Sequence, residues 1–377
     1  MGDATSGAPV RYRVSPGGVG QVLLDRPKAL NSLTQDVVED LIAHLTVWRA
    51  LPSVRVVTLA GAGERAFCAG GDVVAARAAI LAGDFEAAAR FWEREYDLIE
   101  LVATYPKPVV ALQHGYVMGG GLGLSAHAAH RWATPDTRFA MPETGIGFFP
   151  DAGISHRLAR APGETGTYLA LTGATIDATS GRYADLTDHL LAPAALAAAL
   201  AALEGGCDPA EALVVARTQI GRPGPVPDGA SLQLDDEGPS RLEADRTWID
   251  PCFAPTAAAA APAAPAAAPA ADEEAAVGPG EEAVGILHRL ETHPDPRARE
   301  CATLLRGRSP LSVAVALARV RAARAEPDVV AALATDRRIA RAMMRDGDFV
   351  EGVRARLVDK DEAQWRHTNQ KAVTPQR

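Results

Sequence analysis

The strongest constraint on the fold is an alternation of short apolar runs with segments of helical periodicity. The runs cover residues 19–24, 54–60 and 109–112, and turn-forming residues lie close to each of them. Short runs of this kind predict buried strands. Because the strands alternate with helical segments, we expect an α/β protein whose strands are joined by crossover connections.

The helical segments follow from apolar spacing and from capping residues. Asn31 to Thr34 offer N-cap residues to a first helix with an apolar face through residue 45. Residues 85–101 also have helical periodicity, and apolar spacing predicts helical structure across residues 163–203. Towards the C-terminus we expect four more helices, at residues 284–290, 310–325, 329–344 and 349–358.

One segment interrupts this pattern. Residues 257–271 consist of 12 alanines and three prolines, which predicts a flexible linker or an exposed insertion. The composition divides the chain into four predicted regions. These are a core region at 1–203, a helical extension at 204–253, a low-complexity insertion at 254–283 and a C-terminal helical region at 284–377.

Charge and cysteine usage exclude several classes of protein. The chain has 38 basic and 47 acidic residues, a net charge of −9, which argues against a general binder of nucleic acid or anionic membranes. The net charge does not exclude a single anionic ligand bound in a local basic pocket. The four cysteines form no CxxC pair, so we expect neither a structural zinc site nor a disulfide framework.

No apolar segment resembles a signal peptide or a membrane-spanning helix. The default expectation is a soluble, cytoplasmic protein.

Two glycine loops are the first candidates for chemistry, at residues 67–72 and 119–123. Each is predicted to follow a strand and precede a helix, where glycine lets backbone N–H groups approach a ligand. Two such groups from separate loops can bind a developing oxyanion. For either loop alone, a simple tight turn is the favoured reading by about two to one. A dinucleotide fingerprint at 121–126 is rejected, because residues 114–118 separate it from its strand.

A carboxylate loop is the second candidate. Glu143 and Asp151 lie in an otherwise apolar segment, where the charged form of a carboxylate is disfavoured and proton exchange near neutral pH is favoured. Helix capping by both acids is an equally weighted alternative. Weaker candidates are two lone histidines, a serine without a GxSxG context, and two acids on a helix: His114, His156, Ser125, Glu93 and Glu95.

Together these segments resemble the crotonase (enoyl-CoA hydratase/isomerase) superfamily over about residues 10–200. The matching segments are LDRPKALNSL at 24–33, AFCAGGD at 66–72, HGYVMGGG at 114–121 and FAMPE at 139–143. REY at 94–96, ETGIGFFPD at 143–151, SPLS at 309–312 and the segment 346–361 are similar to the 3-hydroxyisobutyryl-CoA hydrolase branch. The resemblance implies a spiral of ββα units with a C-terminal helical region that binds an acyl-CoA.

The resemblance also assigns roles. The N–H groups of Gly71 and Gly120 would form an oxyanion hole, and Glu143 would activate water or attack the thioester itself. Asp151 would hold a substrate hydroxyl or orient water. Glu95 and Asp72 would contact the substrate.

One departure distinguishes the activities within the superfamily. Hydratases carry a first glutamate two residues after the Gly-Gly-Gly run, where this chain has Gly123. Hydration of a double bond by their mechanism is therefore disfavoured. Hydrolysis of a short β-hydroxyacyl-CoA, above all 3-hydroxyisobutyryl-CoA, is the leading expectation. A lyase or isomerase of the same superfamily and a non-catalytic acyl-CoA binder are the alternatives.

The remaining expectations concern ligands and partners. Arg26, Lys28 and Lys360 are candidates for binding the CoA phosphates, by resemblance alone. No metal or cofactor is expected, since coenzyme A enters as part of the substrate. The segment 154–156 departs from the more glycine-rich family pattern, which leaves the acyl group open. Nucleic acid and membrane are not expected partners, whereas the C-terminal helices could assemble a homo-oligomer.

Overall fold

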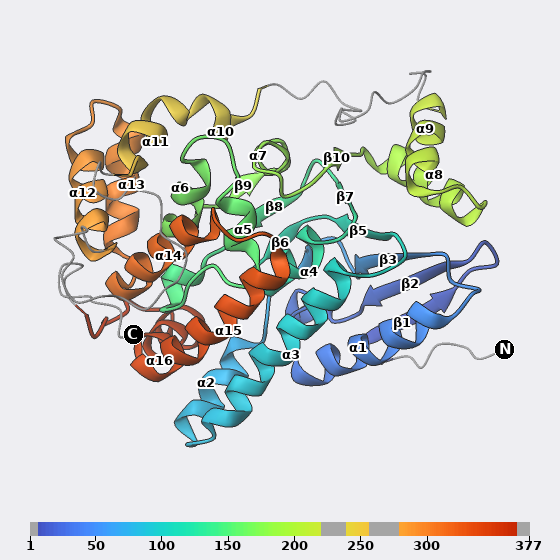
Figure 1. The fold of residues 1–377 in the computed structure, drawn as a ribbon, viewed down its shortest axis with the longest axis horizontal. Coiled ribbons are helices and arrows are strands. Elements are labelled where there is room, and N and C mark those ends of the chain that lie inside the picture. The colour runs from blue at the N-terminus through green and yellow to red at the C-terminus, as the bar shows by residue number, and fades with distance from the viewer. Residues whose placement is uncertain (1–6, 220–238, 256–278, 368–377) are drawn as a thin grey trace. The chain divides into compact units, whose positions relative to one another are not determined.

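The computed structural model describes residues 7–219, 239–255 and 279–367. The Ala/Pro tract at 257–271 lies outside the described residues. The chain divides into two compact units. Their helices and strands are labelled in Figure 1. Among the described residues, the first unit comprises 7–72, 89–140, 175–219 and 239–243, and the second comprises 73–88, 141–174, 244–255 and 279–367.

The strands are short, and all of them belong to the first unit. They are β1 (Val10–Val14), β2 (Val19–Leu24), β3 (Val56–Gly61), β4 (Ala66–Cys68), β5 (Val109–Gln113), β6 (Tyr116–Met118), β7 (His130–Ala133), β8 (Arg138–Ala140), β9 (Ile176–Asp177) and β10 (His189–Leu190).

Helices occur in both units. Those in or beginning in the first unit are η1 (Pro27–Ala29), α1 (Gln35–Ala50), α4 (Gly120–Ala126), α7 (Ala178–Tyr183), α8 (Pro193–Glu204), α9 (Pro209–Gln219) and α10 (Arg241–Ala244). The long α3 (Phe85–Ala103) begins in the second unit and continues through the first. Those of the second unit are α2 (Val73–Leu81), η2 (Glu143–Ile146), α5 (Ile154–Leu158), α6 (Thr165–Thr172), α11 (Arg246–Phe253), α12 (Pro279–Thr292), α13 (Pro296–Arg306), α14 (Pro310–Ala323), α15 (Val329–Asp346), α16 (Asp348–Val353) and η3 (Arg354–Asp359).

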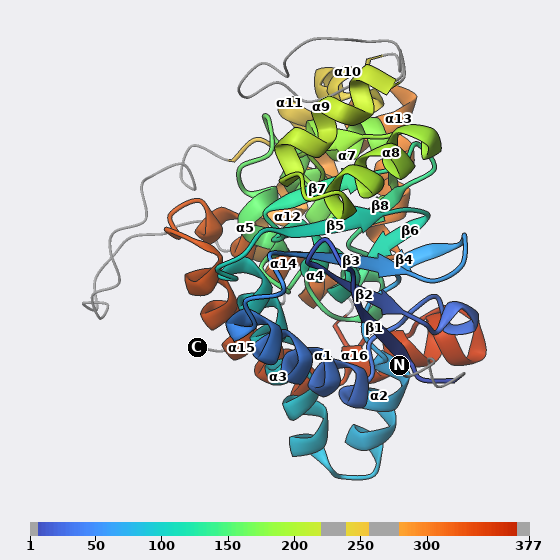
Figure 2. The same cartoon turned by 90° about the vertical axis from the view of Figure 1, so that its right-hand side faces the viewer.

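The first unit is a spiral of ββα repeats. Its larger sheet has the order β1-β2-β3-β5-β7-β10, and its smaller sheet has the order β4-β6-β8-β9. The first repeat places both of its strands, β1 and β2, in the larger sheet as an antiparallel pair. In the strand pairs β3/β4, β5/β6 and β7/β8 that follow, the first strand joins the larger sheet and the second joins the smaller sheet. The successive strands β3, β5 and β7 are parallel neighbours, as are β4, β6 and β8. Figure 2 shows β7, β5, β3, β2 and β1 one below another. The predicted α/β class and spiral are confirmed.

The predicted apolar runs form β2, β3 and β5, the three most apolar strands of the larger sheet. The strands of the smaller sheet escaped prediction because β4, β6 and β8 have only three residues each, too few to show alternation. Helical structure across residues 163–203 was predicted in part wrongly. There α6 ends at Thr172, followed by the C-cap residue Gly173 with φ +63°, and β9 and β10 interrupt the segment.

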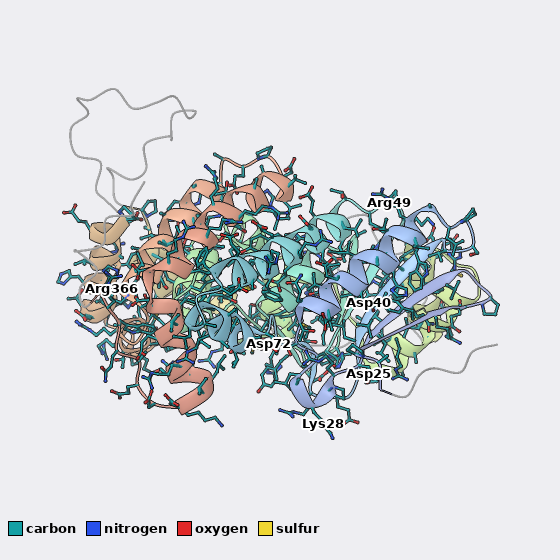
Figure 3. All side chains as sticks on the ribbon, turned by 90° about the horizontal axis from the view of Figure 1, so that it is seen from below. Asp25, Lys28, Asp40, Arg49, Asp72 and Arg366 are labelled. Carbon is teal, nitrogen blue, oxygen red and sulfur yellow. The ribbon has the colours of Figure 1, made fainter. Side chains whose placement is uncertain are left out.

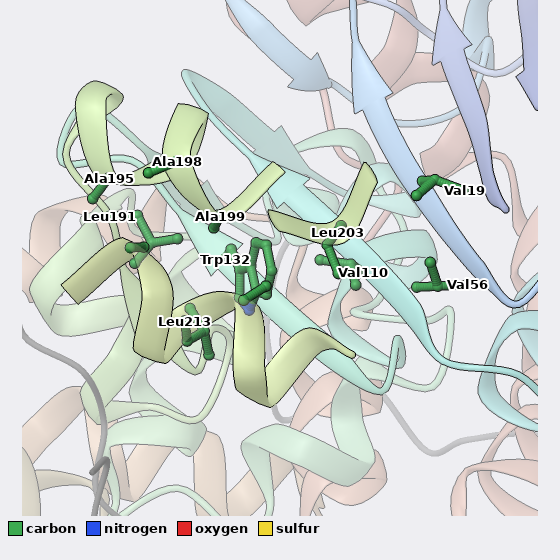
Figure 4. Close-up of a cluster of buried hydrophobic side chains, with 12 residues drawn as sticks. Val19, Val56, Val110, Trp132, Leu191, Ala195, Ala198, Ala199, Leu203 and Leu213 are labelled. Carbon is green, nitrogen blue, oxygen red and sulfur yellow. The ribbon is translucent and has the colours of Figure 1, made fainter. Parts of the chain in front are cut away.

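The core of the larger sheet is covered by α8 and α9. Strand residues Val19, Val56, Val110 and Trp132 pack against apolar side chains of the two helices (Figure 4). The helices contribute mostly alanine, which lets them lie close to the sheet, and Trp132 is fully buried between them. This face of the sheet is structural.

The second unit is helical and is built around α14, which packs against α5, α6 and α12. The four predicted C-terminal helices are present as α12, α14, α15 and α16, and the last continues into a π-helical turn, η3. A fully buried ion pair joins two of these helices, with Arg319 Nε of α14 2.6 Å from Asp336 Oδ1 of α15.

Candidate functional site

The first glycine loop is held in place by the chain that precedes α1. Leu33 N–H donates to Gly70 O at 2.9 Å, and Asp72 N–H donates to Leu33 O at 2.8 Å. Gly70 has φ +105°, which a residue with a side chain rarely adopts. These bonds fix the backbone on both sides of Gly71, whose own N–H is not used by them.

The second glycine loop lies beside the first. Gly119 has φ +52° and its N–H donates to Ala140 O at 3.3 Å, which places Gly120 at the first residue of α4. A Cβ on Gly70 would lie only 3.5 Å from Gly120 N. Within the described residues, neither Gly71 nor Gly120 donates its N–H to a backbone carbonyl outside regular elements. The structure thus brings two candidate donors into one region.

Helix α3 presents two side chains to these glycines. A Cβ on Gly120 would overlap Glu95 Oε1, and a Cβ on Gly71 would lie 3.4 Å from the same oxygen. The same Cβ on Gly71 would lie 2.7 Å from Phe91 Cζ. A side chain at position 71 or 120 would therefore require Phe91 or Glu95 of α3 to shift. Glu95 is 3% exposed, so its carboxylate is enclosed beside both N–H groups.

Cys68 shows that the first glycine loop is shielded from solvent. It is fully buried, and burial raises the pKa of its thiol to about 12, with the nearby Glu95 charge acting in the same direction. A thiol with this pKa stays protonated near neutral pH, which argues against a nucleophilic cysteine.

Of the two cationic candidates in this unit, Arg26 is engaged in its own loop. Its Nη1 donates to Ser32 O at 2.6 Å, and its backbone N–H donates to Asn31 Oδ1 at 2.9 Å. Lys28 is exposed and projects away from the ribbon near Asp25 (Figure 3). Asn31 has φ +56° and its amide donates to Ala62 O and Ala66 O, so it ties this loop to β4.

Glu143 belongs to the second unit. It opens the 3₁₀ turn η2 directly after Pro142, and it is 6% exposed. Its carbonyl accepts from Phe148 N–H at 2.9 Å, which closes the turn. Phe148 packs against Phe149 and against Phe349 of α16, with ring centroids 5.0 and 5.6 Å apart. The Glu143 carboxylate therefore belongs to a turn that packs mainly against apolar side chains.

The C-terminal helices hold the Glu143 turn. Ser309 N–H donates to Thr144 O at 3.1 Å, and the Ser309 hydroxyl donates to Asp348 Oδ2 at 2.6 Å. Gly147, with φ +74°, packs so closely on the Asp348 carbonyl that a Cβ would overlap it. Ser309 and Asp348 are fully buried. We call Thr144, Ser309 and Asp348 the turn clamp. The sequence segments at 309–312 and 346–361 therefore support Glu143.

Asp151 also lies in the second unit and is 4% exposed. Its carbonyl accepts from Ile154 N–H at 2.9 Å, and the two residues after it have positive φ, +56° at Ala152 and +73° at Gly153. Gly153 N–H donates to Asp336 Oδ2 at 2.8 Å, so the buried Arg319–Asp336 pair anchors this loop. Neither acid is an N-cap, since those positions are Pro142 and Gly153, and the capping alternative is wrong.

Two of the weaker candidates make structural hydrogen bonds. His114 Nε2 lies 3.0 Å from Gly63 O, and Ser125 accepts from Gln113, so both have structural partners. Lys360 is exposed in the second unit with φ +57°. Gly71, Gly120, Glu95 and Asp72 belong to the first unit. Within the described ranges, no set of three His, Cys, Asp or Glu side chains is arranged to hold a metal ion.

Comparison with known proteins identifies the family of this chain. The family model of enoyl-CoA hydratase/isomerase matches residues 19–377. The chain belongs to the enoyl-CoA hydratase/isomerase family. Family membership supports an enzyme that acts on acyl-CoA. Among the described helices, none is both long and apolar enough to cross a membrane.

Three proteins that are similar to this chain are named as a hydrolase, a hydratase and a ribosomal protein. The mitochondrial 3-hydroxyisobutyryl-CoA hydrolase of Danio rerio is 32% identical over 96% of this chain and 86% of its own length. An enoyl-CoA hydratase structure from Rhodobacter sphaeroides 2.4.1 superposes with a TM-score of 0.80 at 33% identity, covering 98% of this chain and 95% of that one. Small ribosomal subunit protein mS47 of Neurospora crassa is 42% identical over 47% of this chain and 35% of its own length.

Proposed function

We propose that this protein hydrolyses the thioester of a short β-hydroxyacyl-CoA, with 3-hydroxyisobutyryl-CoA, an intermediate of valine breakdown, as its substrate. The observation that carries the proposal is the pattern of acids. Glu143 and Asp151 are both present and buried, whereas Gly123 stands where hydratases carry their first glutamate. The extended similarity to a 3-hydroxyisobutyryl-CoA hydrolase supports the same branch.

The proposed reaction uses the N–H groups of Gly71 and Gly120 for the thioester oxygen. A water oxygen adds to the carbonyl carbon, the C–S bond breaks, and coenzyme A leaves as a thiolate that takes up a proton. The two N–H groups would stabilise the oxyanion of the tetrahedral intermediate, and losing one such donor typically costs about 3 kcal/mol. The close approach of the two glycine loops in the first unit supports this role.

Glu143 would supply the base or the nucleophile. As a general base it would take a proton from the attacking water, and as a nucleophile it would form an anhydride that water then cleaves. A single turnover in ¹⁸O water separates these routes, because only the anhydride route can place the label in the Glu143 carboxylate. Asp151 would hold the substrate hydroxyl or orient the water.

The decisive experiment measures free thiol released from 3-hydroxyisobutyryl-CoA, 3-hydroxypropionyl-CoA and crotonyl-CoA. We expect release from the hydroxyacyl substrates, loss of release in Glu143→Gln, and retained acyl-CoA binding in that variant. The proposed reaction draws on carboxylates and N–H groups, so EDTA treatment should leave the rate unchanged. No release from any hydroxyacyl-CoA would refute the proposal.

A second candidate is a lyase or isomerase of acyl-CoA, favoured by the similarity to the enoyl-CoA hydratase structure. Consumption of crotonyl-CoA without thiol release would establish it despite Gly123. The similarity to a ribosomal protein makes a non-catalytic role the third candidate, although that protein matches under half of this chain. Acyl-CoA binding without turnover of any of the three substrates would favour that role.

A further inference from the structure

Phe91 lies against the backbone of the first glycine loop. Its Cζ and Cε1 atoms are 2.7 and 2.8 Å from the position of a Cβ on Gly71, so the ring edge contacts the peptide that carries the candidate donor. Phe91 and Glu95 are one helical turn apart on α3 and therefore lie on the same face of this helix. One face of α3 thus presents an apolar ring and a carboxylate to Gly71.

The ring of Phe91 is held in this position. It is 7% exposed, and it packs edge-to-face on Trp92, with ring centroids 5.5 Å apart and an interplanar angle of 79°. Trp92 is itself buried. Because both rings are enclosed, Phe91 cannot turn aside for a ligand as an exposed side chain could.

We propose that Phe91 limits the length of the acyl chain that the protein accepts. The inference rests on the proposed binding of an acyl-CoA carbonyl by Gly71 and Gly120. With the carbonyl oxygen on Gly71 N–H, the inference places the first acyl carbons near the Phe91 ring, because the ring edge lies so close to Gly71. A longer acyl chain would then meet the enclosed ring, whereas a short one would end before it. Phe91 would be a specificity-determining residue, not one that takes part in bond breaking.

The test uses ketone analogues of acyl-CoA, in which a methylene group replaces the thioester sulfur, with acyl chains of three to eight carbons. Binding is measured by calorimetry on the full chain, so the result does not depend on turnover. In Phe91→Ala, the affinity for the eight-carbon analogue relative to the three-carbon analogue should rise at least about tenfold. This is the low end of what a few methylene groups contribute in an apolar pocket. Phe91→Leu, a milder change, should give an intermediate rise.

Ile99→Ala is the matched control. Ile99 is fully buried on α3, two turns beyond Phe91, so this variant removes buried volume from the same helix away from Gly71. It should leave the chain-length preference unchanged. An unchanged preference in both Phe91 variants, or an equal shift in Ile99→Ala, would overturn the inference.

The outcome separates this inference from the proposed function. If the wild-type protein binds the analogues but releases no thiol from acyl-CoA substrates, hydrolysis fails and the role of Phe91 is still decided by the binding series. If it binds none of the analogues, both are overturned.

Discussion

The carboxylate of Glu95 occupies the space that a side chain at position 120 would need. A Cβ on Gly120 would overlap Glu95 Oε1 and would lie 2.8 Å from Glu95 Cδ. Glu95 is buried, so its carboxylate has to shift within enclosed surroundings to admit that Cβ. The residue types at positions 95 and 120 therefore depend on each other, although the two positions belong to different helices, α3 and α4.

This relationship predicts coupled stabilities. Gly120→Ala should lower the free energy of unfolding by about 1–3 kcal/mol, the usual cost of overpacking. In a Glu95→Ala background, where the overlapping oxygen is gone, the same substitution should cost at least about 1 kcal/mol less. Urea unfolding of the four proteins of this double-mutant cycle measures the coupling.

Gly285→Ala is the control for this cycle. Gly285 lies within α12, and a Cβ there would meet only Arg289 Nη1, at 3.4 Å. It should be neutral or stabilise by about 0.5–1 kcal/mol, as alanine does inside a helix. An equal cost of Gly120→Ala with and without Glu95 would contradict the structure.

The sequence predicted the architecture well where the signal was local. The apolar runs at 19–24, 54–60 and 109–112 were recognisable as buried strands, because each contains enough β-branched residues to indicate one. The helix at 85–101 was equally visible. The three-residue strands of the smaller sheet were not, because their pairing comes from the register of the neighbouring repeats.

The candidate site was only partly visible. Glycine loops and buried acids can be read from residue types, and the roles of Gly71, Gly120, Glu143 and Asp151 stay predictions. No local pattern marks Phe91, since an aromatic residue on an amphipathic helix normally indicates core. The turn clamp was visible only as a family motif, because Ser309 and Asp348 lie far from Thr144 in sequence and meet it only in the fold.

The turn clamp predicts a contrast between two serines of one motif. Ser309→Ala should lower the free energy of unfolding by about 1.5–3 kcal/mol, because it removes a buried hydrogen bond to the Asp348 carboxylate. It should also lower kcat more than it raises KM if the turn positions Glu143 for the proposed reaction. Thermal unfolding and thiol-release kinetics measure both effects, and Ser309→Thr should restore part of each.

Ser312 provides the comparison. Its hydroxyl is fully buried and has no hydrogen-bond partner among the residues that the structure describes. Ser312→Ala should therefore change the free energy of unfolding by less than about 0.5 kcal/mol. Equal losses in Ser309→Ala and Ser312→Ala would mean that the clamp contributes no more than packing.

Two half-buried histidines predict a loss of stability in acid. His130 and His189 begin the neighbouring strands β7 and β10, and burial lowers the pKa of both, against the opposing attraction of Asp188. Their folded-state pKa values lie below the ordinary value near 6.5, so they contribute stability above that pH and lose it as pH falls. Other charges that act on them come from Asp208, Arg131 and Arg182.

Thermal midpoints between pH 7.5 and 5 measure this loss. The wild-type midpoint should fall with pH, and the double variant His130→Gln/His189→Gln should show a shallower fall. His288→Gln, at an exposed position of α12, should follow the wild-type profile. Parallel profiles for the wild type and the double variant would show that the two histidines do not carry the effect.

Thiol reactivity reports the rigidity of the first glycine loop. Burial raises the pKa of Cys68 and of Cys301 to about 12 and also raises the pKa of Cys252, while Cys207 is only half-buried. Thiolate is the reactive form, so Ellman's reagent at pH 8 should label Cys207 first in the native protein and all four cysteines after denaturation. Cys68 should react only as fast as the loop opens. Rapid native labelling of Cys68, identified by mass spectrometry, would mean that the loop is open in solution and cannot hold Gly71 N–H in one place.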